Sequence, residues 1–122
     1  MKNEMQIIQK DQLLIIRFFG EIDNLVTKNY RERLVYLIKE KEFPYVIMNF
    51  EHVNFIDSSG IGMVLGRYNQ IKGYNGILFV TKLSKITYKL FDLTGIFKII
   101  DCIDNEEIPL VKVGRSNESN GS

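Results

Sequence analysis

The chain has 122 residues, of which 45% are hydrophobic, and its formal net charge is +1 at pH 7. This length suits one domain with one core, and the balanced charge argues against a nucleic-acid-binding surface. No apolar run approaches the roughly 20 residues that span a membrane, and the N-terminus lacks the apolar core of a signal peptide.

Two strands open the chain, and a helix is expected to follow them. Apolar stretches at 5–8 and 13–19 predict a hairpin that turns at Lys10-Asp11, with Gly20 ending its second strand. Apolar residues then recur at helical spacing from Val26 onward, which predicts an amphipathic helix of about ten to fifteen residues. Pro44 stops this helix, because proline cannot continue a helical hydrogen-bond pattern.

Strands and helices alternate along the rest of the chain. The expected strands lie at 45–50, at 77–80 and within 97–103. The expected helices lie at 61–71, ended by Gly73, and between Ser84 as N-cap and Gly95. Acidic residues at 104–107 resemble a further helix start, with Pro109 in its first turn; the alternative is that Pro109 makes the C-terminus mostly irregular. The polar tail at 115–122 is expected to be disordered.

The alternation predicts a single α/β domain, spanning 1–114, with helices packed on a mixed sheet. After the opening hairpin the order is β-α-β-α-β-α-β, which implies right-handed crossovers and a parallel core. Ligands and partners of such sheets gather at the carboxyl ends of the strands. Two polar segments are expected there, at 21–24 and 57–60.

The second polar segment belongs to the stretch FIDSSGIGMVLGRY. Asp57 or Ser58 before a helix is an ordinary N-cap, worth roughly 1 kcal/mol. Capping does not explain Gly62 and Gly66, since each glycine costs a helix roughly 1 kcal/mol relative to alanine. With Gly73, they fall within about 40° of one another on the outer flank of the helix. Either another molecule approaches this flank closely, or the glycines pack against a neighbouring loop.

Most chemical interpretations of this turn fail on the residues available. A phosphate-binding P-loop needs a lysine after its glycines, and a serine hydrolase needs a base. The single histidine, His52, fits the end of a strand better, and with the single cysteine, Cys102, it is too little for a structural zinc site. A lone cysteine also forms no internal disulfide, which favours a cytoplasmic protein. Asp23 and Asp57 are expected to lie near each other, but a carboxylate pair alone does not indicate catalysis. We expect no enzyme, metal or cofactor.

One chemistry needs only an accessible hydroxyl, and that is phosphorylation by a kinase. A phosphate adds about −1.5 to −2 charges and three acceptor oxygens. The free N–H groups of a helix N-terminus tolerate this charge. Beside Asp57, a phosphorylated serine would form a strongly anionic spot that excludes a closely docked partner.

Four motifs carry a resemblance to a known family: GEID at 20–23, YVIMNF at 45–50, FIDSSGIGMVLGRY at 55–68 and KLFDLTGIFKII at 89–100. With these motifs in this order, the chain resembles the anti-sigma factor antagonists of the STAS family, and most closely the sporulation type that acts on anti-sigma F. Lys85 departs from the pattern, since the family often has a proline after the serine that opens this helix. The resemblance implies a STAS-like fold and transcription regulation by partner switching.

In such a system the unphosphorylated antagonist binds an anti-sigma factor that is also a serine kinase, and this frees the sigma factor. The resemblance implies that the kinase phosphorylates Ser58 and that a serine phosphatase reverses the reaction. It implies a docking face of Asp23, Asp57, Ser58, Ser59, Gly60, Ile61 and Gly62. Ser59 carries a second hydroxyl and stays open as a minor site. The alternative is a STAS module that senses a small anion or nucleotide at the same helix N-terminus.

Overall fold

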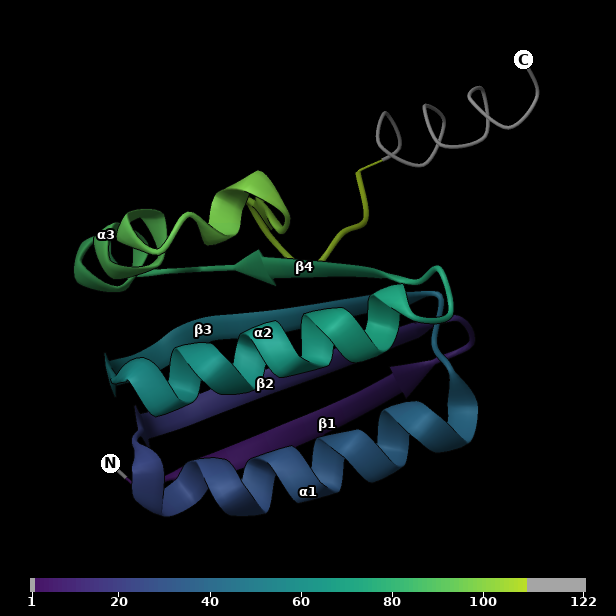
Figure 1. The fold of residues 1–122 in the computed structure, drawn as a ribbon, viewed down its shortest axis with the longest axis horizontal. Helices are drawn as coiled ribbons and strands as arrows, with labels where there is room; N and C mark the ends of the chain where they lie inside the picture. The colour runs from purple at the N-terminus through teal and green to yellow at the C-terminus, as the bar shows by residue number, and fades with distance from the viewer. Residues whose placement is uncertain (1, 110–122) are drawn as a thin grey trace.

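The computed structural model describes residues 2–109, and these form one sheet with helices on one face (Figure 1). The strands are β1 (Glu4–Lys10), β2 (Leu13–Ile22), β3 (Tyr45–Ile56), β4 (Ile77–Thr81) and β5 (Asp101–Ile103). The helices are α1 (Asn24–Lys41), α2 (Ser58–Lys72), α3 (Lys85–Leu93) and a short 3-10 turn, η1 (Ile96–Lys98). The predicted tail at 115–122 and the domain boundary at 114 lie outside the described residues.

The sheet has the order β1-β2-β3-β4-β5. β1 pairs with β2 in an antiparallel hairpin, and all other neighbours are parallel, so the predicted mixed sheet is confirmed. Parallel strands bring their carboxyl ends to the same edge of a sheet. All three α-helices therefore begin at one end of the molecule, on the left in Figure 1.

The core lies mainly between the sheet and the helices. In β2, Leu14, Ile16 and Phe18 are buried in the large cluster that also contains the helical core residues. Ile15, between them, belongs instead to a small cluster with Ile47 and Phe79 on the other face of the sheet. Because side chains alternate along a strand, this burial on both faces explains the continuous apolar runs seen in the sequence.

β2 does not end at Gly20, so that prediction was wrong. Gly20 has a φ of +87° and lies at a shift in the pairing register, where glycine adopts a conformation that other residues rarely reach. Pairing then resumes, with Glu21 opposite Phe55 and Ile22 opposite Ile56. The predicted strand at 45–50 is likewise longer than expected. β2 and β3 thus continue as a two-stranded ribbon past the end of β4.

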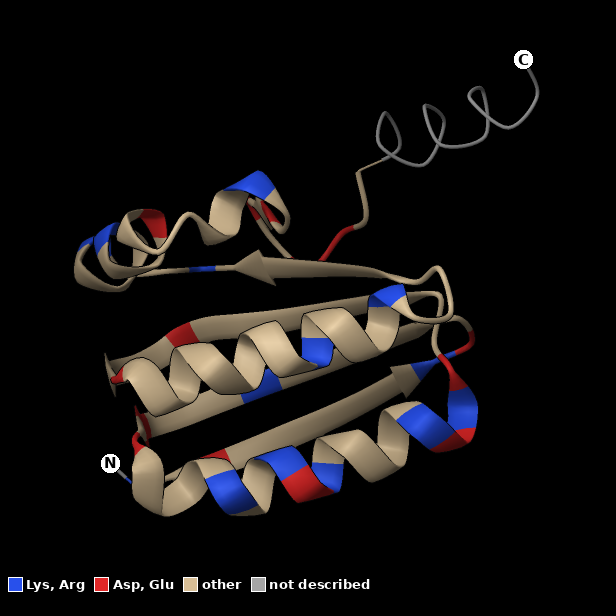
Figure 2. Cartoon of the chain, viewed as in Figure 1, with Lys and Arg blue, Asp and Glu red and all other residues tan. Residues whose placement is uncertain are grey.

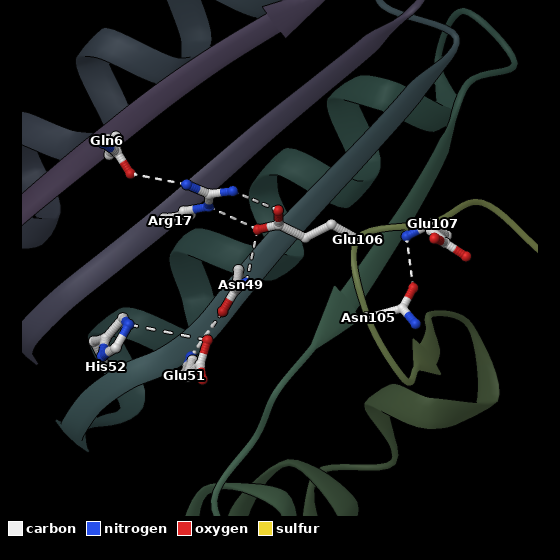
Figure 3. Close-up of polar contacts among 8 residues, drawn as sticks. All are labelled: Gln6, Arg17, Asn49, Glu51, His52, Asn105, Glu106 and Glu107. Atoms are coloured by element: carbon white, nitrogen blue, oxygen red, sulfur yellow. Dashed lines mark hydrogen bonds and ion pairs between the residues drawn. The ribbon is translucent and has the colours of Figure 1, made fainter.

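Of the two alternatives for 104–107, the helix start was wrong: the segment is irregular, and a distant contact holds it against the sheet (Figure 3). The Arg17 guanidinium donates to both carboxylate oxygens of Glu106, at 2.8 and 2.7 Å. Asn49 Nδ2 donates to the same carboxylate at 2.7 Å. Arg17 and Asn49 are register partners on β2 and β3, so they form one receptor for the Glu106 side chain.

This clamp predicts that stability falls in acid. The hydrogen bonds from Arg17, assisted by Asn49 and by the positive charge of Arg17, hold the pKa of Glu106 below its ordinary value. A lowered folded-state pKa stabilises the protein above the unfolded pKa, about 4.3, and this contribution is lost as the pH falls through the folded value. Glu106→Gln is expected to cost about 1–3 kcal/mol of unfolding free energy at pH 7 and much less at pH 3.

Urea unfolding at a series of pH values measures this difference. Glu107→Gln is the matched control, because Glu107 is exposed and points away from Arg17 in Figure 3. A Glu106→Gln cost that stays constant from pH 7 to pH 3 would contradict the ionic character of the clamp.

Candidate functional site

The β2–β3 ribbon carries the two polar turns that the sequence singled out. The backbone N–H of Asp57 donates to the carbonyl of Ile22 at 3.2 Å, so the turn before α2 lies directly beside the turn before α1. The expected proximity of the turns that carry Asp23 and Asp57 is therefore confirmed. Both helices start at this end of the molecule and run side by side across the sheet (Figure 1).

Asp57 is the N-cap of α2. Its Oδ1 accepts hydrogen bonds from the N–H groups of Ser59 at 2.9 Å and Gly60 at 3.2 Å. Ser58 is thereby fixed as the first residue of the helix, where it is exposed, whereas Ser59 is only partly exposed. Of the two hydroxyl groups in this turn, that of Ser58 is the more accessible to an enzyme.

Asp23 makes the same kind of cap at the start of α1. Its Oδ1 accepts from Leu25 N at 3.0 Å and from Val26 N at 3.3 Å. The cap turns the Leu25 side chain outward, and 83% of it is exposed. Phe55, near the end of β3, is 48% exposed. The sequence analysis missed Leu25 and Phe55, although an apolar residue directly beside a capped polar turn is a usable signal for an interface.

The glycines of α2 divide into two kinds. A Cβ atom on Gly60 would lie 2.5 Å from Ile56 Cγ1 and 2.9 Å from the Ile22 carbonyl oxygen, so Gly60 allows α2 to pack against the ribbon. Ile61 is buried as well, with 6% of its surface exposed. A Cβ on Gly62 would meet nothing within 4 Å, so this residue faces open space. Two residues of the predicted docking face, Gly60 and Ile61, therefore lie beneath the surface and pack the start of α2 against the rest of the fold.

Gly60→Ala is expected to destabilise the fold. The new methyl group would press on backbone as well as on a side chain, and overpacking of this kind typically costs about 1–3 kcal/mol. Gly66→Ala on the same helix is the control, because a Cβ there also meets nothing within 4 Å and alanine favours helix by roughly 1 kcal/mol. Thermal unfolding of the two variants measures both effects, and equal stability would contradict this packing role of Gly60.

A groove of about 530 Å³ runs between α1 and α2, starting at Ser59 and Gly62. It is lined by Lys28 and Arg31 from α1 and reaches Arg67 of α2. Arg67 is only 7% exposed, and this burial, with the nearby charge of Arg31, lowers its pKa. The sequence analysis missed Arg67, since arginine is rarely buried and nothing in its spacing marks it.

Among residues 2–109, no group of three or more His, Cys, Asp and Glu side chains is placed to hold a metal ion. Within the same range, no helix has the length and apolar character needed to cross a bilayer. His52 lies within β3, stacked on Phe19 with ring centroids 4.9 Å apart, and not at a strand end.

Comparisons with known proteins agree with this architecture. The STAS domain family model matches residues 4–108. The chain is 32% identical over 94 residues to the anti-sigma F factor antagonist of Paenibacillus polymyxa, covering 77% of this chain and 80% of that protein.

Two solved structures of the anti-sigma factor antagonist SpoIIAA are also similar. The unphosphorylated form has a TM-score of 0.70 at 26% identity and covers 93% of this chain and 98% of its own. The phosphorylated form, from Bacillus, has a TM-score of 0.70 at 28% identity, and the match covers 84% of this chain and 94% of the SpoIIAA chain. From its motifs, its fold and these relatives, the chain belongs to the anti-sigma factor antagonists of the STAS family.

Proposed function

We propose that this chain is a partner-switching antagonist whose binding is controlled by phosphorylation of Ser58. In the unphosphorylated state it binds an anti-sigma factor that is also a serine kinase, and so releases the sigma factor. The kinase modifies Ser58, and a serine phosphatase restores the binding form. In this role the protein works in the cytoplasm and catalyses no reaction itself. The sigma factor that it releases would serve a sporulation programme.

The exposed position of Ser58 at the capped start of α2 carries this proposal. The Asp57 carboxylate accepts from the N–H groups of Ser59 and Gly60, so the backbone that carries Ser58 is held in place at the surface. Gly62, one turn along α2, leaves open space beside it. The exposed Leu25 lies on the neighbouring turn. An accessible hydroxyl, open space along the helix and a nearby apolar side chain together support docking of a kinase at this turn.

Phosphorylation is proposed to block a contact and to leave the backbone unchanged. The helix N-terminus favours a phosphate by about 0.3–1 kcal/mol, while the nearby carboxylates oppose it, and both effects are small against a stability of about 5–15 kcal/mol. Backbone amide chemical shifts are expected to change near Asp23 and Ser58–Gly62, and shifts spread through β3 would contradict this.

The alternative, a sensor of a small anion or nucleotide at the α2 N-terminus, has weaker support. An anion at a helix N-terminus is held by free N–H groups. Here the Asp57 carboxylate already accepts from two of them, and it adds a negative charge at the same place. Titration calorimetry of the isolated chain with nucleotides measures whether they bind. Saturable binding without a protein partner would favour this alternative.

Incubation with the cognate anti-sigma kinase and ATP tests the proposed function. Mass spectrometry of the digested chain is expected to find one phosphate, on the peptide that contains Ser58. The unphosphorylated chain is expected to form a stable complex with the kinase, and the phosphorylated chain is not. A chain that neither binds the kinase nor takes up phosphate would overturn the proposal.

A further inference from the structure

The groove between α1 and α2 opens beside the proposed phosphorylation site but extends well beyond it. Ser59 and Gly62 line its start, and Gly66 and Arg67 line it further along α2. Lys28 and Arg31 lie on the α1 side and are exposed. A molecule docked on the Ser58 turn therefore has a continuous path into this groove.

Arg67, in the groove wall, has an incomplete set of hydrogen bonds. Its Nε donates to Gln70 Oε1 at 3.0 Å, and Gln70 Nε2 donates to the Val35 carbonyl of α1 at 2.9 Å. These contacts fix the guanidinium between the two helices. Its Nη1 is buried and has no hydrogen-bond partner. Burying a donor without a partner is unfavourable, so an acceptor that reaches it is favoured.

The charge of the groove is of one sign. Three cationic side chains line it, those of Lys28, Arg31 and Arg67, and no acidic residue does. Lys28 and Arg31 are three residues apart on α1, so they lie on the same face of the helix. Arg31 is close enough to Arg67 to lower its pKa, so the groove holds two neighbouring cations without a counter-charge among its lining residues.

The shape of the groove fits an extended chain. A Cβ on Gly62 or Gly66 would meet nothing within 4 Å, so the α2 wall is low at both positions. Charged residues are also absent from the first half of α2 after its acidic cap, and this part of the helix is tan in Figure 2. A polypeptide backbone can therefore approach α2 closely while its side chains meet the cations of α1.

We propose that the groove between α1 and α2 binds an acidic segment of the protein partner, with carboxylates on Lys28 and Arg31 and one reaching Arg67. This rests on the proposed function, since the segment belongs to the partner that docks at Ser58. Charge complementarity and continuity with the Ser58 turn select a protein segment as the occupant. The contact gives the partner an anchor that phosphorylation does not touch directly.

Charge reversal on the rim tests the groove in the complex of the full chain with its cognate anti-sigma kinase. The double variant Lys28→Glu with Arg31→Glu is expected to weaken binding at least roughly tenfold and to flatten its dependence on salt. Arg33→Glu with Lys39→Glu is the matched control, because both residues are exposed on the same helix and neither lines the groove. Wild-type affinity of the rim double variant, or a loss of affinity in the control double variant as large as in the rim double variant, would overturn the proposal.

Carbodiimide cross-linking gives a second readout that does not depend on variants. This reagent joins an amine to a carboxylate in direct contact, so Lys28 is expected to cross-link to Asp or Glu of the kinase. A complex that forms with wild-type affinity but gives no Lys28 cross-link would overturn the groove contact and leave the proposed function intact. Failure of the wild-type chain to bind the kinase would overturn both.

Two other occupants of the groove, a small anion and a second copy of the chain, would be recognised by different measurements. Saturable binding of inorganic phosphate or ATP to the isolated chain, lost in the double variant, would identify a small-anion site instead. Concentration-dependent dimerisation in sedimentation, abolished by the same variant, would identify a second copy of the chain. Either result overturns a partner segment as the occupant.

Arg67→Met, which keeps an apolar stem of similar length, is expected to weaken kinase binding if it folds.

Discussion

Ser58→Ala is expected to bind the anti-sigma kinase with unchanged affinity and to take up no phosphate. The substitution removes only an exposed hydroxyl, while the cap made by Asp57 uses its own side chain and stays intact. In cells, such a variant would remain in the binding form, so expression from promoters of the released sigma factor is expected to become constitutive. Phosphate incorporation with labelled ATP and kinase affinity by calorimetry measure the two effects.

Ser59→Ala is the control for this prediction. Ser59 is partly exposed and its N–H is held by Asp57, so the variant is expected to be phosphorylated at nearly the wild-type rate. If Ser58→Ala takes up phosphate as fast as the wild type, the assignment of the site is wrong. If only the double variant resists, both hydroxyls are substrates.

Gly62→Gln is expected to weaken kinase binding by roughly tenfold or more while leaving the fold intact. The long side chain would stand in the open space beside Ser58 and clash with a partner that approaches the helix closely. Glutamine favours an exposed helix by several tenths of a kcal/mol over glycine, so the melting temperature is expected to stay equal or rise. Loss of binding with gain of stability separates an interface residue from a structural one.

A second variant controls for an exposed glutamine elsewhere on the same helix. Asn69→Gln places the same side chain at an exposed position of α2 outside the groove lining, and is expected to bind the kinase normally. If Gly62→Gln binds with wild-type affinity, the partner does not approach this part of α2. The glycine would then have no role in docking.

The order of strands and helices was predictable because each element has its own local signal. Alternating and continuous apolar runs marked β1 to β4, and Ser84 caps α3 through the N–H of Thr87 at 3.1 Å, as expected from the sequence. Gly95, with a φ of +77°, follows the end of that helix. Such features depend on neighbours in the chain and on simple periodicity.

Features that depend on distant residues were not predictable. Gly20 looked like the end of a strand, but pairing of Glu21 and Ile22 with β3 carries β2 past it. The acids at 104–107 looked like a helix start, but Arg17 and Asn49 hold Glu106 against the sheet. Both mistakes arise because tertiary contacts override local preference.

The location of the candidate site was predictable from the sequence, but the packing of its residues was not. Motif and chain order indicated that Asp23 and Asp57 lie at one edge, because parallel strands bring their ends together. Nothing in the sequence distinguished Gly60, which is packed against Ile56, from Gly62, which faces open space. The burial of Arg67 could not be predicted from the sequence either, since it depends on how closely α1 approaches α2.

The clamp on Glu106 also sets an order of events during synthesis of the chain. Glu106 and Arg17 are 89 residues apart, and every described strand and helix precedes Glu106, so the ribosome has made all of them before this carboxylate. Domains assemble as they leave the ribosome, and contacts between distant residues form late. Until then, Arg17 and Asn49 have no carboxylate to hold, and the cluster of Ile15, Ile47 and Phe79 lacks Ile108, which packs against it. A released chain truncated before Glu106 would leave this apolar cluster less covered, although every described strand and helix is present.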